Sequence, residues 1–71
     1  MKKINAITLY LDNGEFVGNF AFGRDNPHSF LLQCGVYDRK RDLYVIDNGF
    51  TVTGIGFKLT VLPGYLVKVK E

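Results

Sequence analysis

The stretch ITLYLDNGEFVGNFAF, residues 7–22, decides the fold class of this chain. Apolar residues alternate with others on both sides of Asn13-Gly14, which is the strongest short-range signal for a two-residue type I′ turn. Such a turn pairs Ile7 with Phe20, and the large apolar side chains then share one face of the hairpin. The stretch therefore predicts a β-hairpin with one buried face.

The rest of the chain continues this alternation between turn signals and holds a helical spacing nowhere over three turns. Asn48-Gly49 repeats the type I′ signal and predicts a second hairpin. In the strand that follows, the alternation changes phase at Gly54, where we expect a bulge or bend within one long strand. The expected strands cover residues 3–11, 15–22, 29–37, 43–47, 50–62 and 65–70.

Two of these strands flank a charged turn, Asp38-Arg39-Lys40-Arg41-Asp42. A four-residue loop over 39–42 sets Tyr37 opposite Tyr44 across the ladder, and we expect both rings on its outer side. The inward positions expected on these two strands are Phe30, Leu32, Cys34, Val36, Leu43 and Val45.

This pattern is typical of an all-β protein without a substantial helix. We expect a small barrel or two orthogonal sheets in a meander of about six strands, in the size class of SH3-like and oligonucleotide-binding-like folds. The last strand is expected to close against the first. At 71 residues the chain is long enough for one domain, residues 1–71. Because so small a core stabilises weakly, we expect a homodimer.

Composition excludes several protein classes. Hydrophobic residues make up 46% and charged residues 23%, which is typical of a globular chain. No segment approaches the ~20 apolar residues of a membrane span. Met1-Lys2-Lys3 precedes only a short, interrupted apolar run without a cleavage site, so a signal peptide is rejected. We expect a cytoplasmic protein whose single cysteine, Cys34, is reduced.

The sequence offers little catalytic chemistry. His28 and Cys34 are the only candidate base and nucleophile, and a cysteine on an apolar strand face is more often a small core residue. Asp12 and Glu15 flank a turn, where a carboxylate accepts hydrogen bonds from turn amides. No metal-ligand cluster and no glycine-rich phosphate loop occurs. We therefore expect a protein that is not an enzyme and that uses no metal or cofactor.

The charged turn is the one surface that looks arranged for binding. Guanidinium groups bind phosphate, and tyrosine rings are stacking platforms for bases. The alternative interpretation is a soluble turn, because its two aspartates lower the charge of the turn from +3 to +1 and can pair with the arginines. The residues of this candidate site are Tyr37, Arg39, Lys40, Arg41 and Tyr44.

A second basic region is expected if the first and the last two strands are neighbours. It would bring together Lys2, Lys3, Lys58, Lys68 and Lys70. Lysine on outer faces and strand edges also prevents unwanted strand pairing, which is the structural alternative.

Three functions remain open from the sequence. The favoured one is a non-enzymatic module that binds single-stranded nucleic acid through the hairpin with the charged turn and nearby lysines. The second is a small protein-binding module, such as an inhibitor or assembly factor of the kind that phages and other mobile elements encode. The third is a structural subunit whose only partner is itself. Aromatic residues and arginine are enriched in both kinds of binding interface, so composition cannot separate the first two.

Overall fold

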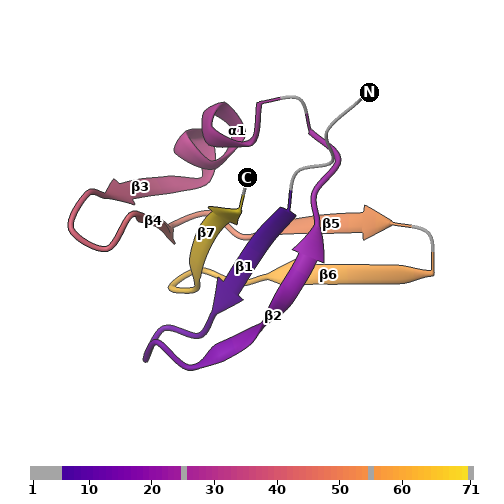
Figure 1. The fold of residues 1–71 in the computed structure, drawn as a ribbon, viewed down its shortest axis with the longest axis horizontal. Helices are drawn as coiled ribbons and strands as arrows, with labels where there is room; N and C mark the ends of the chain where they lie inside the picture. Colours follow the sequence, from indigo (N-terminus) through magenta and orange to yellow (C-terminus); the bar gives the residue numbers. More distant parts are fainter. Residues whose placement is uncertain (1–5, 25, 55, 71) are drawn as a thin grey trace.

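The computed structural model of this chain describes residues 6–24, 26–54 and 56–70. Strands dominate these residues, so the expectation of a mostly β protein is confirmed, with a short helix added. The elements are β1 (Ala6–Tyr10), β2 (Phe16–Ala21), α1 (Pro27–Cys34), β3 (Gly35–Asp38), β4 (Leu43–Ile46), β5 (Phe50–Gly54), β6 (Phe57–Val61) and β7 (Leu66–Lys70) (Figure 1).

The strands form two antiparallel sheets in an order that is not a meander. The larger sheet has five strands in the order β2-β1-β7-β4-β3, and the smaller sheet is the β5–β6 hairpin. In Figure 1 this hairpin runs across the direction of β1 and β7. The prediction that the last strand pairs with the first is confirmed. The described strands form no closed barrel, and the expected meander is wrong because β7 lies between the β1–β2 and β3–β4 hairpins.

The first hairpin has the predicted register over part of its length and a different turn. Ile7 pairs with Phe20 as expected, but the register shifts between Leu9 and Tyr10. Phe16 therefore pairs with Tyr10 and is exposed, instead of sharing the buried face. At the turn, the amide of Gly14 donates to the Leu11 carbonyl at 2.9 Å, and the Leu11 amide donates to the Glu15 carbonyl at 2.8 Å. Of the turn residues only Gly14 has a positive φ, +90°. A type I′ turn needs two positive φ values, so the loop is a three-residue turn with a bulge.

The segment expected as a strand over 29–37 is instead a helix followed by a short strand. Asn26 caps the helix, since its side-chain oxygen accepts from the Ser29 amide at 3.2 Å, and Pro27 occupies the first turn. The helix packs through a stripe with helical spacing, because residues 27, 30, 31 and 34 are buried or half-buried. A strand was expected because apolar residues in the same segment also alternate, at positions 30, 32, 34 and 36.

The long strand expected over 50–62 is a hairpin, β5–β6. The phase of the alternation changes at Gly54 because the chain reverses there, and Gly56 has a φ of +82°. Phe50 pairs with Val61 and Val52 with Leu59, so the apolar residues of both strands share one face. A two-residue connection between antiparallel strands switches the phase in this way.

The second Asn-Gly pair forms no hairpin, because β4 and β5 belong to different sheets. The amides of Asp47 and Asn48 both donate to the Cys34 carbonyl at 2.8 Å, which turns the chain away from the larger sheet. At the next turn, the Tyr65 amide donates to the Leu62 carbonyl at 3.2 Å. Gly64 has a φ of +94°, as position three of a type II turn requires.

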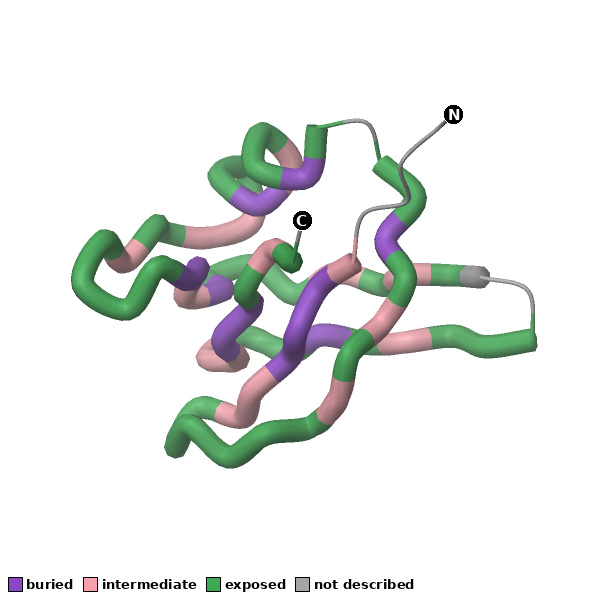
Figure 2. The backbone as a smooth tube through the Cα atoms, in the orientation of Figure 1, coloured by how far each residue is buried: buried purple, intermediate pink, exposed green. Residues whose placement is uncertain are grey.

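The core lies between the larger sheet, α1 and the β5–β6 hairpin, where the buried segments of Figure 2 meet. The inward positions expected around β3 and β4 are confirmed only in part. Leu43 is buried and Phe30 and Cys34 pack against the core. Val36 is 61% exposed and Leu32, on the helix, is 58% exposed, while Tyr44 is buried. The helix covers the face that carries the even residues of β4, which explains the burial of Tyr44. The core side chains are Ile7, Leu9, Phe22, Leu31, Tyr44, Ile46, Val61 and Val67.

Candidate binding surfaces

The turn between β3 and β4 is organised by Asp38. One carboxylate oxygen accepts from the amides of Lys40 and Arg41, at 3.0 and 3.3 Å, and the other accepts from Arg41 Nε at 2.8 Å. The hydrogen bond from Arg41 lowers the pKa of the Asp38 carboxyl. The charge of Arg41 is therefore balanced within the turn, as the soluble-turn interpretation predicts.

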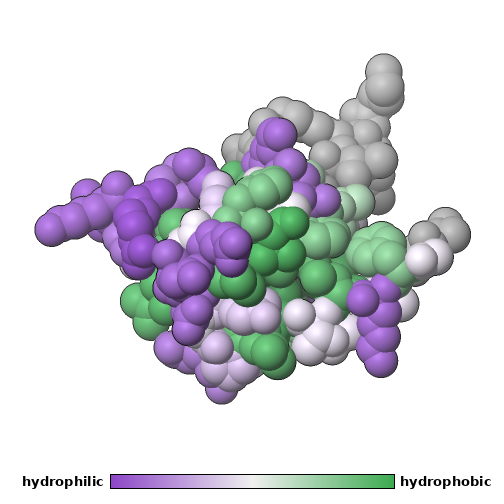
Figure 3. Space-filling view, turned by 90° about the horizontal axis from the view of Figure 1, so that it is seen from below, coloured by the Kyte–Doolittle hydropathy of each residue, from purple (hydrophilic) through white to green (hydrophobic). Residues whose placement is uncertain are grey.

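The other two cations of this turn are directed to solvent. Arg39 and Lys40 are exposed, and their side chains form no hydrogen bond or ion pair with another described residue. The turn protrudes at one end of the molecule, where Figure 3 shows a hydrophilic surface. The turn therefore presents two cations beside a neutralised pair.

The two tyrosines behind the turn differ from each other. Their register is confirmed, with Tyr37 opposite Tyr44 and ring centroids 5.0 Å apart. Tyr37 is 37% exposed and its hydroxyl donates to Asp42, whereas Tyr44 is only 4% exposed. The Tyr44 hydroxyl shares a hydrogen bond of 2.7 Å with Nδ1 of His28. The expectation that both rings face outward is thus wrong for Tyr44, because α1 lies over that face of β4.

The environment of both phenols disfavours ionisation. The hydrogen bond to Asp42 raises the pKa of Tyr37, and burial raises the pKa of Tyr44. A buried ring bonded to His28 cannot stack on a nucleic acid base. Of the expected pair of stacking platforms, only Tyr37 is at the surface.

The expected lysine zone is divided. Lys68 and Lys70 alternate with core-facing Val67 and Val69 on β7, so they lie on the face of the larger sheet that points away from the core. Lys58 lies on the face of β6 opposite the core-facing residues 59 and 61. Since the core lies between the two sheets, Lys58 points away from the other two. Lys2 and Lys3 lie outside the described residues.

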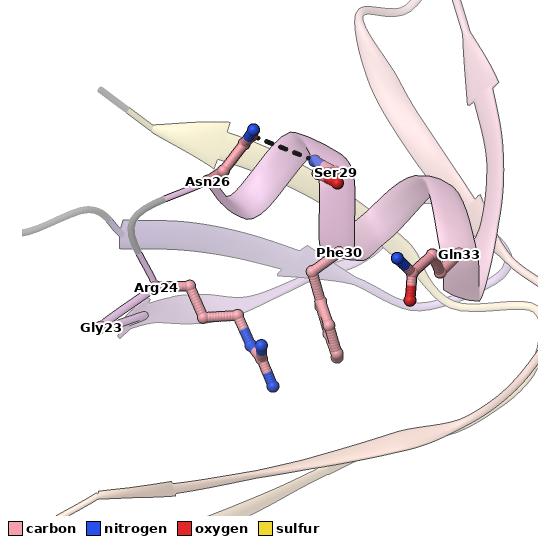
Figure 4. Close-up of a pocket in the computed structure, with 6 residues that line it drawn as sticks. All are labelled: Gly23, Arg24, Asn26, Ser29, Phe30 and Gln33. Carbon is pink, nitrogen blue, oxygen red and sulfur yellow. Dashed lines mark hydrogen bonds between the residues drawn. The ribbon is translucent and has the colours of Figure 1, made fainter.

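Sequence reasoning missed a hollow surface between α1 and the β5–β6 hairpin. The guanidinium of Arg24 lies over the Phe30 ring, 3.8 Å from its centroid. Figure 4 shows Arg24, Phe30 and Gln33 pointing to the same space. Two adjoining hollows of about 460 and 410 Å³ share this region. Their lining residues are Phe22, Gly23, Arg24, Asn26, Ser29, Phe30, Gln33, Thr51, Val52 and Thr53.

The described lining of the hollow includes the cation Arg24 and no carboxylate. No local sequence signal points to this site, because two segments distant in the sequence, within 22–33 and 51–53, build it.

The candidate base and nucleophile are separated by the helix that carries them. Nδ1 of His28 is engaged by Tyr44. Cys34 follows His28 by six positions, which is about 9 Å of helical rise. Burial raises the pKa of the Cys34 thiol, which disfavours the thiolate that a nucleophile needs. This arrangement favours the structural interpretation of both residues.

Comparison with known proteins found no family model, no curated protein and no solved structure that this chain matches. Among the described residues, no group of three or more potential metal ligands occurs. No helix in the described part of the chain has the length and apolar character needed to cross a membrane. The assignment of a function therefore depends on the geometry of the surfaces above.

Proposed function

We propose that this chain is a non-enzymatic module that binds another protein through β3 and the turn that follows it. The observation that carries the proposal is the combination of apolar exposure and charge at this end of the sheet. Val36 is 61% exposed and Tyr37 37% exposed, and Arg39 and Lys40 follow after Asp38. Protein interfaces combine such groups, since burying apolar side chains supplies affinity while cations supply orientation.

Apolar exposure elsewhere on the molecule supports a partner of the same kind. An exposed apolar group gains nothing from a phosphate backbone but gains about 25 cal/mol per Å² from an apolar surface. In Figure 3, apolar atoms occupy the middle of the face between the hydrophilic ends. The large apolar side chains that are more than a third exposed are Phe16, Val17, Leu32, Val36, Tyr37, Phe57 and Leu62.

The charges of the turn indicate the chemistry of the partner. Asp38 forms an ion pair with Arg41, so the turn presents Arg39 and Lys40 together with Asp42, whose carboxylate accepts from Tyr37. A protein with an acidic group beside an apolar patch complements this surface. Such charges mainly increase the association rate, while the apolar contacts determine the lifetime of the complex.

The test is selective capture with a matched control. The wild-type chain, Val36→Asp and Thr51→Asp are immobilised and exposed to extract of the producing cells, and retained proteins are identified and purified. Thr51 lies on the exposed face of β5, away from β3. We expect one protein to bind wild type and Thr51→Asp and to be lost with Val36→Asp, both in capture and in titration of the purified pair. Equal retention by all three forms would contradict the proposal.

A second candidate function, binding of single-stranded nucleic acid, is favoured by one observation. The half-exposed ring of Tyr37 lies beside two cations without a carboxylate partner among the described residues, which resembles the elements of a strand-binding groove. It ranks second because Tyr44 is buried and the lysines are divided between opposite faces.

A salt series separates the two functions. A fluorescently labelled single-stranded oligonucleotide is titrated with the chain at several salt concentrations. Phosphate contacts give a log–log slope of about −0.7 for each contact on a single strand. If the function is protein binding, the chain should have no measurable affinity for the oligonucleotide at low salt. Tight binding with a steep slope that disappears in Arg39→Glu would establish the second candidate instead.

A further inference from the structure

We infer that β2 is the edge through which two copies of this chain pair, antiparallel to each other, across a twofold axis. The surface is the free edge of the larger sheet at β2, with the exposed side chains of Phe16 and Val17. The inference does not depend on the proposed function, because β2 and β3 lie at opposite ends of the strand order.

The edge of β2 is long and without a strand neighbour in the described part of the chain. β2 has six residues and pairs on one side with β1 only. Its outer row of amides and carbonyls is thus available to a further strand. An exposed strand edge of this kind is a template for pairing with another chain.

The composition of β2 lacks the usual protection of an edge. Residues 16–22, FVGNFAF, contain no charged residue and no proline. The opposite edge is protected, because β3 has only four residues and is followed directly by the charged turn. Among the described strands, β6 and β7 carry lysines. A strand that pairs with a second copy must avoid such charges, because twofold symmetry places each charge in the interface twice and brings charges near the axis close to their own copies.

The exposed side chains of β2 are those that pairing would bury. Phe16 is 56% exposed and Val17 is 43% exposed. A bulge in the β1–β2 pairing lies at this point, between the partners of Leu9 and Tyr10. It leaves the Phe16 ring against Tyr10, with centroids 6.0 Å apart, so the aromatic pair extends the edge with an apolar surface.

The charge that precedes β2 favours the antiparallel arrangement of two identical copies. Glu15 is the residue directly before the strand. Parallel pairing would bring the Glu15 carboxylates of the two copies together, whereas antiparallel pairing places them at opposite ends of the interface.

The test is the oligomeric state of the full chain by sedimentation over a concentration series. We expect wild type to be a dimer at high concentration. In Val17→Lys the dissociation constant should rise roughly tenfold or more, because tenfold corresponds to ~1.4 kcal/mol and symmetry places two lysines in one interface. Val36→Lys is the matched control on the opposite edge and should leave the dimer unchanged. Ala21→Lys, also exposed on β2, repeats the test if Val17→Lys does not fold.

Amide hydrogen exchange identifies the edge that pairs. Amides of residues 16–21 should exchange more slowly above the dissociation constant than below it, and amides of β3 should not change. A wild-type chain that stays monomeric at every concentration would overturn the inference. So would a dimer that survives both β2 variants, or one that is lost in Val36→Lys.

Discussion

Gly35, where α1 meets β3, has less space for a side chain than any other described glycine. A Cβ atom added there would lie 2.1 Å from the Val45 carbonyl oxygen. The backbone is extended, with φ near −166°, so the requirement for glycine is one of space and not of conformation. Because Gly35 pairs with Ile46, its missing side chain allows the helix end and β4 to approach closely.

We expect Gly35→Ala to lower the free energy of unfolding by ~2 kcal/mol, because the added methyl group overlaps backbone that cannot move without breaking the β3–β4 pairing. Urea denaturation measures the difference. Gly23→Ala is the control, since a Cβ at Gly23 meets nothing within 4 Å, and it should change stability by less than about 0.5 kcal/mol. Equal effects of the two substitutions would contradict this account.

Helix α1 shows what the sequence could and could not predict about an element. Asn26-Pro27 is a helix-start signal, and positions 27, 30, 31 and 34 have helical spacing. The same segment alternates at 30, 32, 34 and 36, and over so few residues both patterns fit. Packing of Leu31 into the core decides the outcome, and no local rule contains that information. Because of the wrong element, Val36 was expected inward and Tyr44 outward, whereas Leu43 is buried as expected.

Other elements could be predicted where residues close in the sequence determine them. The register of the β3–β4 hairpin follows from loop length and alternation, and it was predicted correctly. The charged turn is equally local, so its position as a protruding tip could be predicted. The burial of Tyr44 and the hollow beside Arg24 could not, because both depend on where α1 packs.

We expect Asn26→Ala to destabilise the protein by ~1 kcal/mol, because the Ser29 amide loses its acceptor at the start of an eight-residue helix. Thermal unfolding followed by circular dichroism measures the loss. Asn26→Asp retains an acceptor oxygen and should stay close to wild type. A loss in Asn26→Asp as large as that in Asn26→Ala would show that the cap is unimportant.

At the scale of the whole molecule, the two raised phenol pKa values predict sensitivity to alkali. Tyr37 and Tyr44 both have a pKa above the ordinary value of 10.0 in the folded protein. At a pH between the ordinary pKa and the raised pKa of the folded protein, these tyrosines ionise in the unfolded chain but not in the folded chain. Their contribution to stability is therefore complete below about pH 10 and is lost as the pH rises through the folded pKa values.

Tyr44→Phe tests this dependence. The variant should lose about 1 kcal/mol at neutral pH with its hydrogen bond to His28, and its stability should then fall less steeply than that of wild type above about pH 10. Urea titrations at a series of pH values measure both effects. A decline as steep as that of wild type would show that Tyr44 makes no contribution to the alkaline transition.

The position of β7 has a consequence for how the chain acquires its structure during synthesis. β7 joins the two hairpins of the larger sheet, with five residue pairs to β1 and two to β4. The strands up to Val61 emerge from the ribosome before β7, and they form three hairpins, β1–β2, β3–β4 and β5–β6, that no strand pairing joins. The native sheet can be completed only after residues 66–70 leave the exit tunnel. Until that moment β1 is itself an open edge, to which a strand of a neighbouring nascent chain can pair.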